Sequence, residues 1–469
     1  MAIMSESFAQ SAHDGKSAPT HFYSRIRFWF GLATVIALLA VAAVPTLLLL
    51  PAGSKPAPGA PPSVAITIPV SPTVAAPVAG LLAEQARRDQ NAISQVLNIR
   101  ANAVTAKQTD AFLQTTEQSS VDFTTKQLRL ITNLNQLPLE QWDYELDGKL
   151  DGTSSLARQV RRTFGSNAQT YQVKVRYALT GFGDKPTVAL RTMSFIPQGQ
   201  TWKVVSDIDS GRFRQPWDEN YLSVVQGPDV LMMVMGSAKP TPSLMQQASQ
   251  AVAAVTTFWG SDWQRKVEIV IPASQRELGN LLRRNGADYS SLAALATAEG
   301  NGGPDDVPTN VVWVNPSGFA KINSLGRTIV LRHEILHVAT GAAIPNDFPL
   351  WLEEGTAEYF GYKDSGVKQD VIAANLLQAT RSGQVPTRLP TTKDFSPLNG
   401  QLDQAYEGSW WAVRYIVQTY SEQALLRVYR NALGQADPAT AADRALREEL
   451  GIDTAQLTAA WRASIRAAA

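Results

Sequence analysis

The sequence contains no cysteine and only four histidines among its 469 residues. Without cysteine, disulfide bonds, thiolate zinc sites and cysteine nucleophiles are all excluded. The histidines are His13, His21, His333 and His337, so an imidazole-based metal site in the folded part must use the last two. Because 42 basic residues nearly balance 41 acidic ones, the formal net charge is only +1, which argues against nucleic acid as a partner.

Residues 28–50 form a run of 23 residues without a charge. As a helix this run would be about 34 Å long, enough to cross a hydrocarbon core of about 30 Å. Lys16, Arg25 and Arg27 precede it, so the positive-inside rule places residues 1–27 in the cytoplasm and the rest outside. A cleaved signal peptide is the alternative, but its apolar core is usually only about 7–15 residues long. We therefore expect a single-pass protein of the cell membrane.

Two regions of different composition follow the apolar run. Residues 51–80 carry eight prolines and almost no charge, which predicts an extended linker. Residues 81–225 begin with helical patterns and continue with alternating apolar and polar runs at 170–179, 187–196 and 201–208. Such alternation, with turn residues between the runs, predicts an antiparallel meander.

This order of helices followed by strands resembles the cone-shaped nuclear-transport-factor-2-like fold. The resemblance rests on pattern alone, and folds of this kind serve many unrelated functions. No catalytic constellation occurs in the region, and its protein partner is unknown. We expect Asp207, Asp209 and Arg212 to be surface charges at the end of a strand.

Residues 226–469 form the third unit, which is also α+β. Apolar strands are predicted at 230–236, 266–272 and 310–316, and helical patterns dominate from residue 324 to the C-terminus.

The helical pattern at 329–339 contains the motif HEILH, from His333 to His337. Two histidines one helical turn apart project from one face and can bind one metal ion. Glu334 lies about 100° around the helix, where it can reach a metal-bound water without ligating the metal. Water acidified by Zn²⁺ and deprotonated by a glutamate is the nucleophile of metal-assisted amide hydrolysis. A chance match on a surface helix is the alternative, but the flanking residues are apolar.

Catalytic zinc usually has three protein ligands, and no further histidine is available. The pattern PLWLEEGTAEYFG at 349–361 predicts a second helix with three glutamates. Glu354 and Glu358 lie one turn apart on one face, whereas Glu353 is expected to point about 100° away from Glu354. Glu354 is the candidate third ligand, and Glu358 the candidate acceptor for an imidazole N–H. A solvated helix face is the alternative interpretation.

HExxH followed by a WLxEG helix resembles the gluzincin zinc peptidases, particularly peptidase-MA-like proteins, the aminopeptidase N family and thermolysin-like enzymes. The resemblance implies that Glu354 is the third zinc ligand, after a connection slightly shorter than in the aminopeptidase N family. It also implies that Glu358 orients His333. The segment QAYEG is similar to the Tyr-Glu-Lys-Gly segment of those enzymes, which implies that Tyr406 stabilises the oxyanion, although Gly408 comes one position early.

The amine-capturing Gly-x-Met-Glu-Asn segment of those aminopeptidases has no counterpart before His333. An endopeptidase acting on peptides or proteins of the cell envelope is therefore favoured over an aminopeptidase. In gluzincins a strand edges the cleft and pairs with extended substrate, and 310–316 is the candidate. Two alternatives stay open: an envelope scaffold that retains zinc in an inactive peptidase fold, and a zinc hydrolase of non-peptide substrates.

Overall fold

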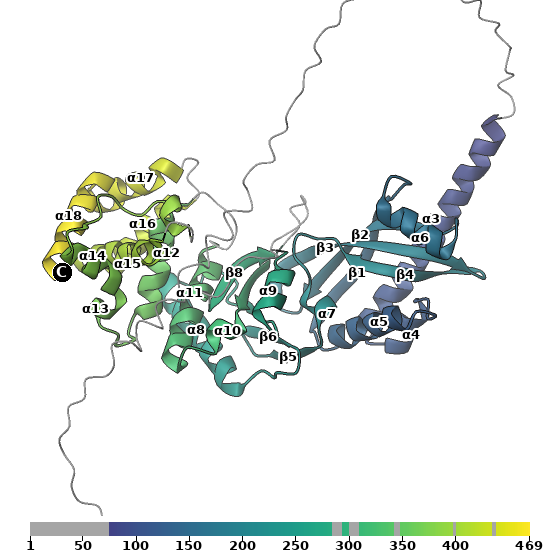
Figure 1. The fold of residues 1–469 in the computed structure, drawn as a ribbon, viewed down its shortest axis with the longest axis horizontal. Helices are drawn as coiled ribbons and strands as arrows, with labels where there is room; N and C mark the ends of the chain where they lie inside the picture. The colour runs from purple at the N-terminus through teal and green to yellow at the C-terminus, as the bar shows by residue number, and fades with distance from the viewer. Residues whose placement is uncertain (1–74, 284–292, 300–308, 342–347, 397–399, 434–437) are drawn as a thin grey trace, which may run out of the picture.

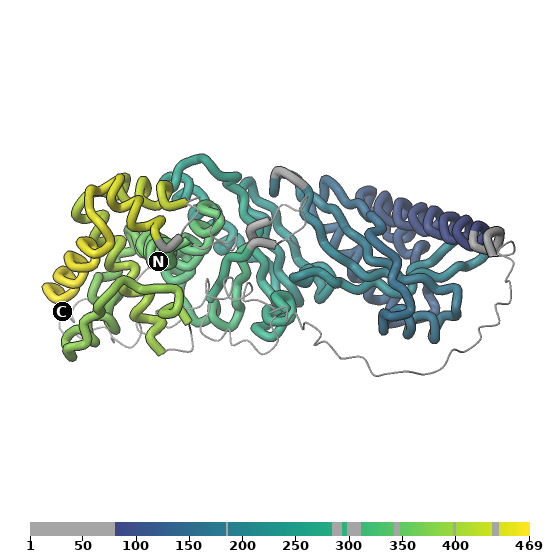
Figure 2. The backbone as a smooth tube through the Cα atoms, turned by 90° about the horizontal axis from the view of Figure 1, so that it is seen from above, coloured from purple at the N-terminus to yellow at the C-terminus, as the bar shows by residue number. Residues whose placement is uncertain are grey.

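The computed structural model describes residues 75–283, 293–299, 309–341, 348–396, 400–433 and 438–469. Within these ranges the chain is a mixed α+β protein, as the sequence predicts. Figure 2 shows three parts in a row: a first sheet with its helices, a second sheet, and a group of C-terminal helices. No helix in the described ranges is long and apolar enough to cross a membrane, and the anchor predicted at 28–50 lies outside them.

The first part is an antiparallel sheet in the order β1-β2-β3-β4, as the alternating runs predict. Its strands are Leu139–Lys149, Gln169–Leu179, Phe182–Gln198 and Thr201–Asp209. Its helices are α3 (Ala75–Thr105), α4 (Thr109–Gln114), α5 (Val121–Leu134) and α6 (Ser155–Phe164). Apolar residues of α3, including Ile93 and Leu97, pack on one face of the sheet against Val173 and Phe195. Val160 of α6 packs against Val205 of β4 in a separate apolar cluster.

Helix α3 begins inside the segment expected to be an extended linker, which was predicted to reach residue 80. Pro77 falls in its first turn, where a missing N–H breaks no helical hydrogen bond. The helix ends where Lys107 adopts a left-handed backbone conformation, with φ of 56°, and α4 follows directly.

A cluster of charged side chains is buried inside this first part, and the expectation that Asp207 lies at the surface is wrong. The Asp207 carboxylate is fully buried between the guanidinium groups of Arg100 and Arg191. Arg191 also donates to Asp218 at 2.8 and 3.1 Å, and Arg100 lies 3.6 Å from the centre of the Phe112 ring. Asp207 is at the end of a strand as expected, but helix α3 covers that end.

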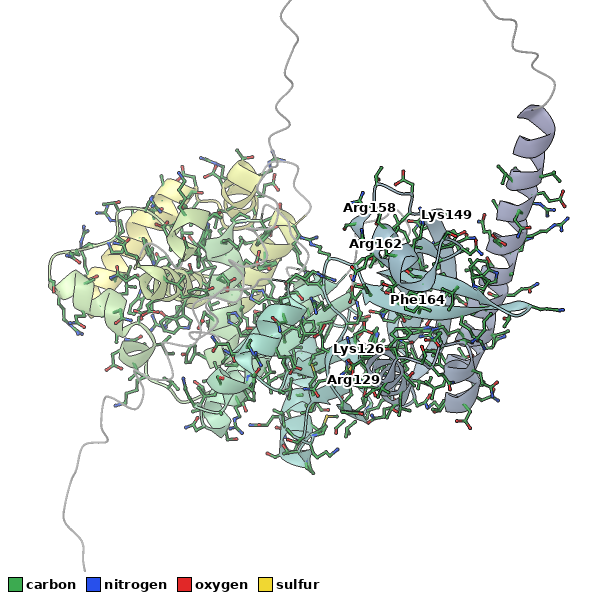
Figure 3. All side chains as sticks on the ribbon, turned by 45° about the vertical axis from the view of Figure 1, so that its right-hand side comes forward. Lys126, Arg129, Lys149, Arg158, Arg162 and Phe164 are labelled. Carbon is green, nitrogen blue, oxygen red and sulfur yellow. The ribbon has the colours of Figure 1, made fainter. Side chains whose placement is uncertain are left out.

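Other basic side chains lie on the outside of the same part, all on one side of it (Figure 3). Within the described chain none of these five forms an ion pair with a carboxylate: Lys126, Arg129, Lys149, Arg158 and Arg162.

The second sheet has five strands in the order β5-β6-β7-β9-β8. These are Leu222–Gln226, Val230–Met235, Val267–Ile271, Thr309–Val314 and Ala294–Glu299, in that order across the sheet. Strand β5 crosses the expected domain boundary at 225/226, because it pairs with β6 rather than with the first sheet.

The edge strand of this sheet differs from the one predicted. Strand β9, within the run at 310–316, lies inside the sheet between β7 and β8. Strand β8 forms the edge instead and pairs antiparallel with β9. Its sequence ALATAE is rich in alanine, which is depleted in strands, so the pattern gave no sign of it.

Helices cover one face of the second sheet, and the first part of the chain covers the other (Figure 1). Helices α8 (Pro242–Trp259) and α11 (Ser324–Thr340) pack on the first of these faces. On the opposite face one apolar cluster joins Trp142 and Tyr177 of the first sheet to Leu231 and Trp313 of the second. Trp217, in the short helix α7 (Pro216–Glu219), packs in the middle of this cluster. The two sheets thus share a hydrophobic core.

The remaining short elements between the strands and α11 are α9 (Gln275–Leu281) and α10 (Pro316–Phe319). The C-terminal part consists of α12 (Leu350–Tyr362), α13 (Gln369–Ile372), α14 (Ala374–Arg381), the 3₁₀ turn η1 (Thr392–Phe395), α15 (Leu402–Thr419), α16 (Glu422–Ala432), α17 (Pro438–Leu450) and α18 (Thr454–Ala468). Helix α12 packs against both α11 and α15, which brings three helices together at the predicted metal site.

Candidate metal centre

Helix α11 presents the two histidines from the interior of the protein. Its first turn is capped by the Asn323 side chain, which accepts from the Gly326 N–H at 2.9 Å. It ends at Gly341, whose φ of 75° suits a residue without a side chain. The motif residues His333, Glu334 and His337 are all buried between these two ends.

Helix α12 approaches its neighbours unusually closely at two glycines. A Cβ atom on Gly355 would lie 2.5 Å from the carbonyl oxygen of Ser409 in α15. A Cβ on Gly361 would lie 3.1 Å from the carbonyl oxygen of Ile329 in α11. The glycine that follows Glu354 is therefore needed for packing, because it lets α15 lie directly against the helix that carries the glutamates.

The structure brings His333, His337 and Glu354 together. Their ligand atoms lie within 4.8 Å of one another, and this is the one such cluster in the described ranges. The two Nε2 atoms are 3.1 Å apart, and Oε2 of Glu354 lies 3.4 Å from that of His333 and 3.5 Å from that of His337. The three atoms form a nearly equilateral triangle.

This triangle has the size that zinc requires. A tetrahedral ion with bonds of about 2.0–2.1 Å separates its ligand atoms by about 3.3 Å. Both oxygens of Glu354 are buried and make no hydrogen bond of normal geometry with any described residue. A metal ion would supply the partner that these atoms need, and two imidazoles with one carboxylate are a typical donor set for zinc.

The charges around the triangle stabilise a cation. Burial alone would lower the pKa of His337, but Glu354, Glu353 and Glu334 outweigh burial and raise it to about 9. Burial alone would raise the pKa of Glu354, but the two imidazoles outweigh it, so the pKa falls below its usual range. Positive charge is thus favoured at the centre of the cluster, where Zn²⁺ would lie.

A carboxylate lies beside the outer nitrogen of each histidine. Oε1 of Glu358 is 3.8 Å from Nδ1 of His333, which is the arrangement predicted for that pair. Oε1 of Glu353 is 3.9 Å from Nδ1 of His337. Glu353 was expected to lie about 100° around the helix from Glu354, and no role was predicted for it. Its carboxylate nevertheless reaches His337, because α12 packs against α11 and approaches the imidazoles with more than one of its faces.

Glu334 lies next to the triangle and contacts the edge of the second sheet. Its carboxylate accepts a hydrogen bond from the backbone N–H of Ala296 in β8. The other oxygen, Oε2, is buried and has no hydrogen-bond partner in the described ranges. Burial raises the pKa of Glu334, and Glu354 adds to this, although the imidazoles oppose it. A carboxylate with a raised pKa is suited to exchange a proton near neutral pH.

Tyr406 reaches the same region from α15. Its side chain is buried against the ring of Phe395, and its hydroxyl makes no hydrogen bond within the described part of the chain. Burial raises its pKa well above the usual value, and the carboxylates of Glu354, Glu358, Glu334 and Glu353 raise it further. The hydroxyl therefore stays protonated and available as a donor near the metal site.

Comparison with known families agrees with this geometry. Residues 302–467 match the family model of the Peptidase MA superfamily. This region belongs to the Peptidase MA superfamily. The cofactor is Zn²⁺, and His333, His337 and Glu354 fit it as ligands.

Solved structures similar to this chain include an M1 zinc metallopeptidase from Deinococcus radiodurans, with 11% identity and a TM-score of 0.33. A mutant of that enzyme has 12% identity and a TM-score of 0.34. In both comparisons the matched part covers 57% of this chain and 59% of the other, so the chain spans less than two thirds of these structures. Among curated proteins, none matches this sequence.

Three features of this peptidase MA site escaped the sequence patterns: the edge strand β8, the N–H of Ala296 and the carboxylate of Glu353. The first two depend on how α11 lies across the sheet, which no local pattern encodes. The third had a signal, the second glutamate of WLEEG, but a helical wheel describes directions on one helix only.

Proposed function

We propose that this chain is a membrane-anchored zinc endopeptidase that hydrolyses peptide bonds of proteins in the cell envelope, outside the cytoplasm. One observation carries the proposal: the triangle of His333, His337 and Glu354 atoms has an unsatisfied carboxylate oxygen, from Glu334, beside it. A ligand set and a base in one buried cluster are what metal-assisted amide hydrolysis requires.

Glu334 acts as the general base. Zinc, when bound, acidifies a water molecule and polarises the scissile carbonyl. The Ala296 N–H fixes one side of the Glu334 carboxylate, which leaves Oε2 to accept a proton from the attacking water. The same oxygen then returns the proton to the leaving amine, and the raised pKa of the Glu334 carboxyl helps it to hold that proton in between.

Tyr406 stabilises the charge that develops on the substrate. Attack of water converts the carbonyl oxygen into an oxyanion, which is stabilised by a donor held in place beforehand. The hydroxyl of Tyr406 is buried, protonated and without a competing acceptor. Its single role is to donate a hydrogen bond to that oxygen.

Strand β8 is the surface to which extended substrate adds. In the described sheet it pairs on one side only, with β9. Its free edge offers backbone donors and acceptors next to Glu334, where a peptide can add as another strand. Such binding requires no free amino terminus, which supports an endopeptidase over an aminopeptidase.

We also propose an identity for the two folded parts of the chain and for the apolar run before them. The C-terminal part is a thermolysin-like gluzincin domain, and the first sheet with its helices is a nuclear-transport-factor-2-like domain. The apolar run at 28–50 anchors the chain, with residues 1–27 in the cytoplasm. The basic residues before this run and the proline-rich stretch after it support that orientation.

Cleavage of a peptide library tests the activity. The full chain, loaded with zinc, is incubated with peptides in two forms, one with a free and one with an acetylated amino terminus. We expect internal cleavage of both forms by the wild type and a loss of at least about a thousandfold in Glu334→Gln. Release of amino-terminal residues from free peptides alone would replace the endopeptidase assignment with aminopeptidase. Zinc binding with no cleavage of either form would favour the scaffold.

Accessibility to an added protease tests the location. In intact cells whose membrane surface is accessible to the added protease, the protease should digest a tag after Ala469 and leave a tag before Met1 intact. The opposite pattern would contradict the proposed orientation, and recovery of the chain outside the membrane fraction would contradict the anchor.

A further inference from the structure

Glu353 occupies the position that the WLxEG pattern leaves open, and here it carries a second carboxylate into the metal site. Its side chain is only 3% exposed. Oε1 lies 3.9 Å from Nδ1 of His337, at ion-pair distance. Within the described part of the chain, His337 is the one basic side chain within 4.0 Å of this carboxylate.

The positions on α12 explain how three glutamates reach one site. At about 100° per residue, Glu354 lies between Glu353 and Glu358 around the helix. Glu354 faces the Nε2 atoms at 3.4 and 3.5 Å, whereas its neighbours face the Nδ1 atoms on either side. Each imidazole is therefore held between a ligand-side carboxylate and an outer one.

A buried carboxylate with no partner would be costly, so its position needs a reason. The imidazole of a metal-binding histidine almost always donates its other N–H to an acceptor, which fixes the tautomer and the ring orientation. His333 has such an acceptor in Glu358. Among the described residues, Glu353 is the carboxylate placed to do the same for His337.

We propose that Glu353 is a positioning residue that accepts the Nδ1–H of His337 and so presents Nε2 of this histidine to the metal. The inference deepens the proposed function, because it concerns the same site. It concerns metal binding and not turnover, so it can be tested even if the chain cleaves no peptide.

Zinc affinity and zinc release, measured on the full chain by competition with a chelator, test the proposal. Loss of an outer acceptor typically costs about 10–100-fold in metal affinity, and we expect this loss in Glu353→Leu. Glu353→Gln retains an acceptor oxygen and should therefore keep most of the zinc affinity of the wild type. Glu268→Leu is the matched control, because Glu268 is also a buried glutamate, on β7, and no described histidine contacts it.

Three results would overturn the proposal. Zinc affinity in Glu353→Leu could stay within twofold of wild type. The metal-free form of Glu353→Leu could melt at a lower temperature while its zinc affinity is unchanged, which would indicate a purely structural role. Glu268→Leu could lose as much zinc affinity as Glu353→Leu.

Glu353→Gln provides a second readout if Glu353→Leu does not fold. The imidazole N–H protons of the zinc-loaded protein can be followed by NMR. We expect the Nδ1–H resonance of His337 to shift in Glu353→Gln while that of His333 stays in place. An unchanged His337 resonance would show that Glu353 is not its acceptor.

Discussion

The chain contains two buried clusters of charged side chains, and they are balanced in opposite ways. In the first part, Arg100 and Arg191 surround Asp207, and Asp218 completes the pairing, so the cluster contains its own cations. In the peptidase part, four glutamates surround two imidazoles, and within the described residues no lysine or arginine forms an ion pair with Glu334, Glu353 or Glu354. The first cluster is balanced by its own guanidinium groups, whereas the second favours positive charge between its carboxylates.

This difference separates a structural cluster from a metal site. Among the described residues, Oε2 of Glu334 and both oxygens of Glu354 are buried without hydrogen bonds, whereas the Asp207 carboxylate is bonded to both of its arginines. Burial of charge alone does not distinguish the two. The two clusters differ instead in whether their carboxylates have basic partners, and the carboxylates of the second favour a cation such as zinc.

The largest effect is expected in the first cluster. Asp207→Ala leaves two guanidinium groups buried without their shared anion, which should lower the free energy of unfolding by about 3–5 kcal/mol. Zinc affinity should be unchanged, because the cluster lies in the other part of the chain. Urea denaturation and chelator competition measure the two quantities. A change below about 1 kcal/mol, or a parallel loss of zinc, would remove the distinction between the clusters.

The second prediction concerns zinc binding at the second cluster. Zinc added to the metal-free chain at about 100 times the dissociation constant should stabilise it by about 2.7 kcal/mol. Glu354→Ala should gain far less at the same zinc concentration, because one of three ligands is gone. Thermal or urea unfolding at fixed zinc gives the comparison. Equal stabilisation of both proteins would mean that Glu354 is not a ligand.

A smaller loss is expected for the acceptor of His333. Glu358→Gln should weaken zinc binding by about tenfold, or about 1.4 kcal/mol, and leave the melting temperature of the metal-free chain nearly unchanged. Zinc competition and calorimetry of the metal-free protein check both parts. Wild-type affinity in this variant would leave the 3.8 Å contact with His333 without a role.

The smallest effect concerns a buried carboxylate outside both clusters. Burial raises the pKa of Glu268 to about 8, compared with about 4.3 in an unfolded chain. Between these values the folded chain holds a proton that the unfolded chain releases, so this group makes folding less favourable as pH rises.

Glu268→Gln cannot ionise, so its free energy of unfolding relative to wild type should increase by roughly 1.3 kcal/mol from pH 5 to pH 6. Urea denaturation across this pH range measures the difference. A constant difference between the two proteins would show that folding does not raise the pKa of Glu268.

The sequence predicted those parts of the molecule that depend on local periodicity. HEILH has helical spacing with apolar flanks, so the position of His333 and His337 on one face of α11 could be predicted. Period-two alternation likewise predicted the antiparallel strands β2, β3 and β4.

The features that were missed depend on contacts between distant elements. Arg100 and Asp207 are 107 positions apart, so no pattern within either segment indicates their pairing. Strand β8 has weak strand composition, so no strand was predicted at residues 294–299. The role of Glu353 depends on the angle at which α12 crosses α11, and that angle follows from packing at Gly355 and Gly361.

The most direct test of the central claim is the zinc content of the purified full chain, measured by mass spectrometry for wild type, Asp207→Asn and Glu354→Gln. The account predicts about one zinc per chain in wild type and Asp207→Asn, and almost none in Glu354→Gln, because a tetrahedral site needs all three protein ligands. A wild type without zinc, or full occupancy in Glu354→Gln, would contradict it.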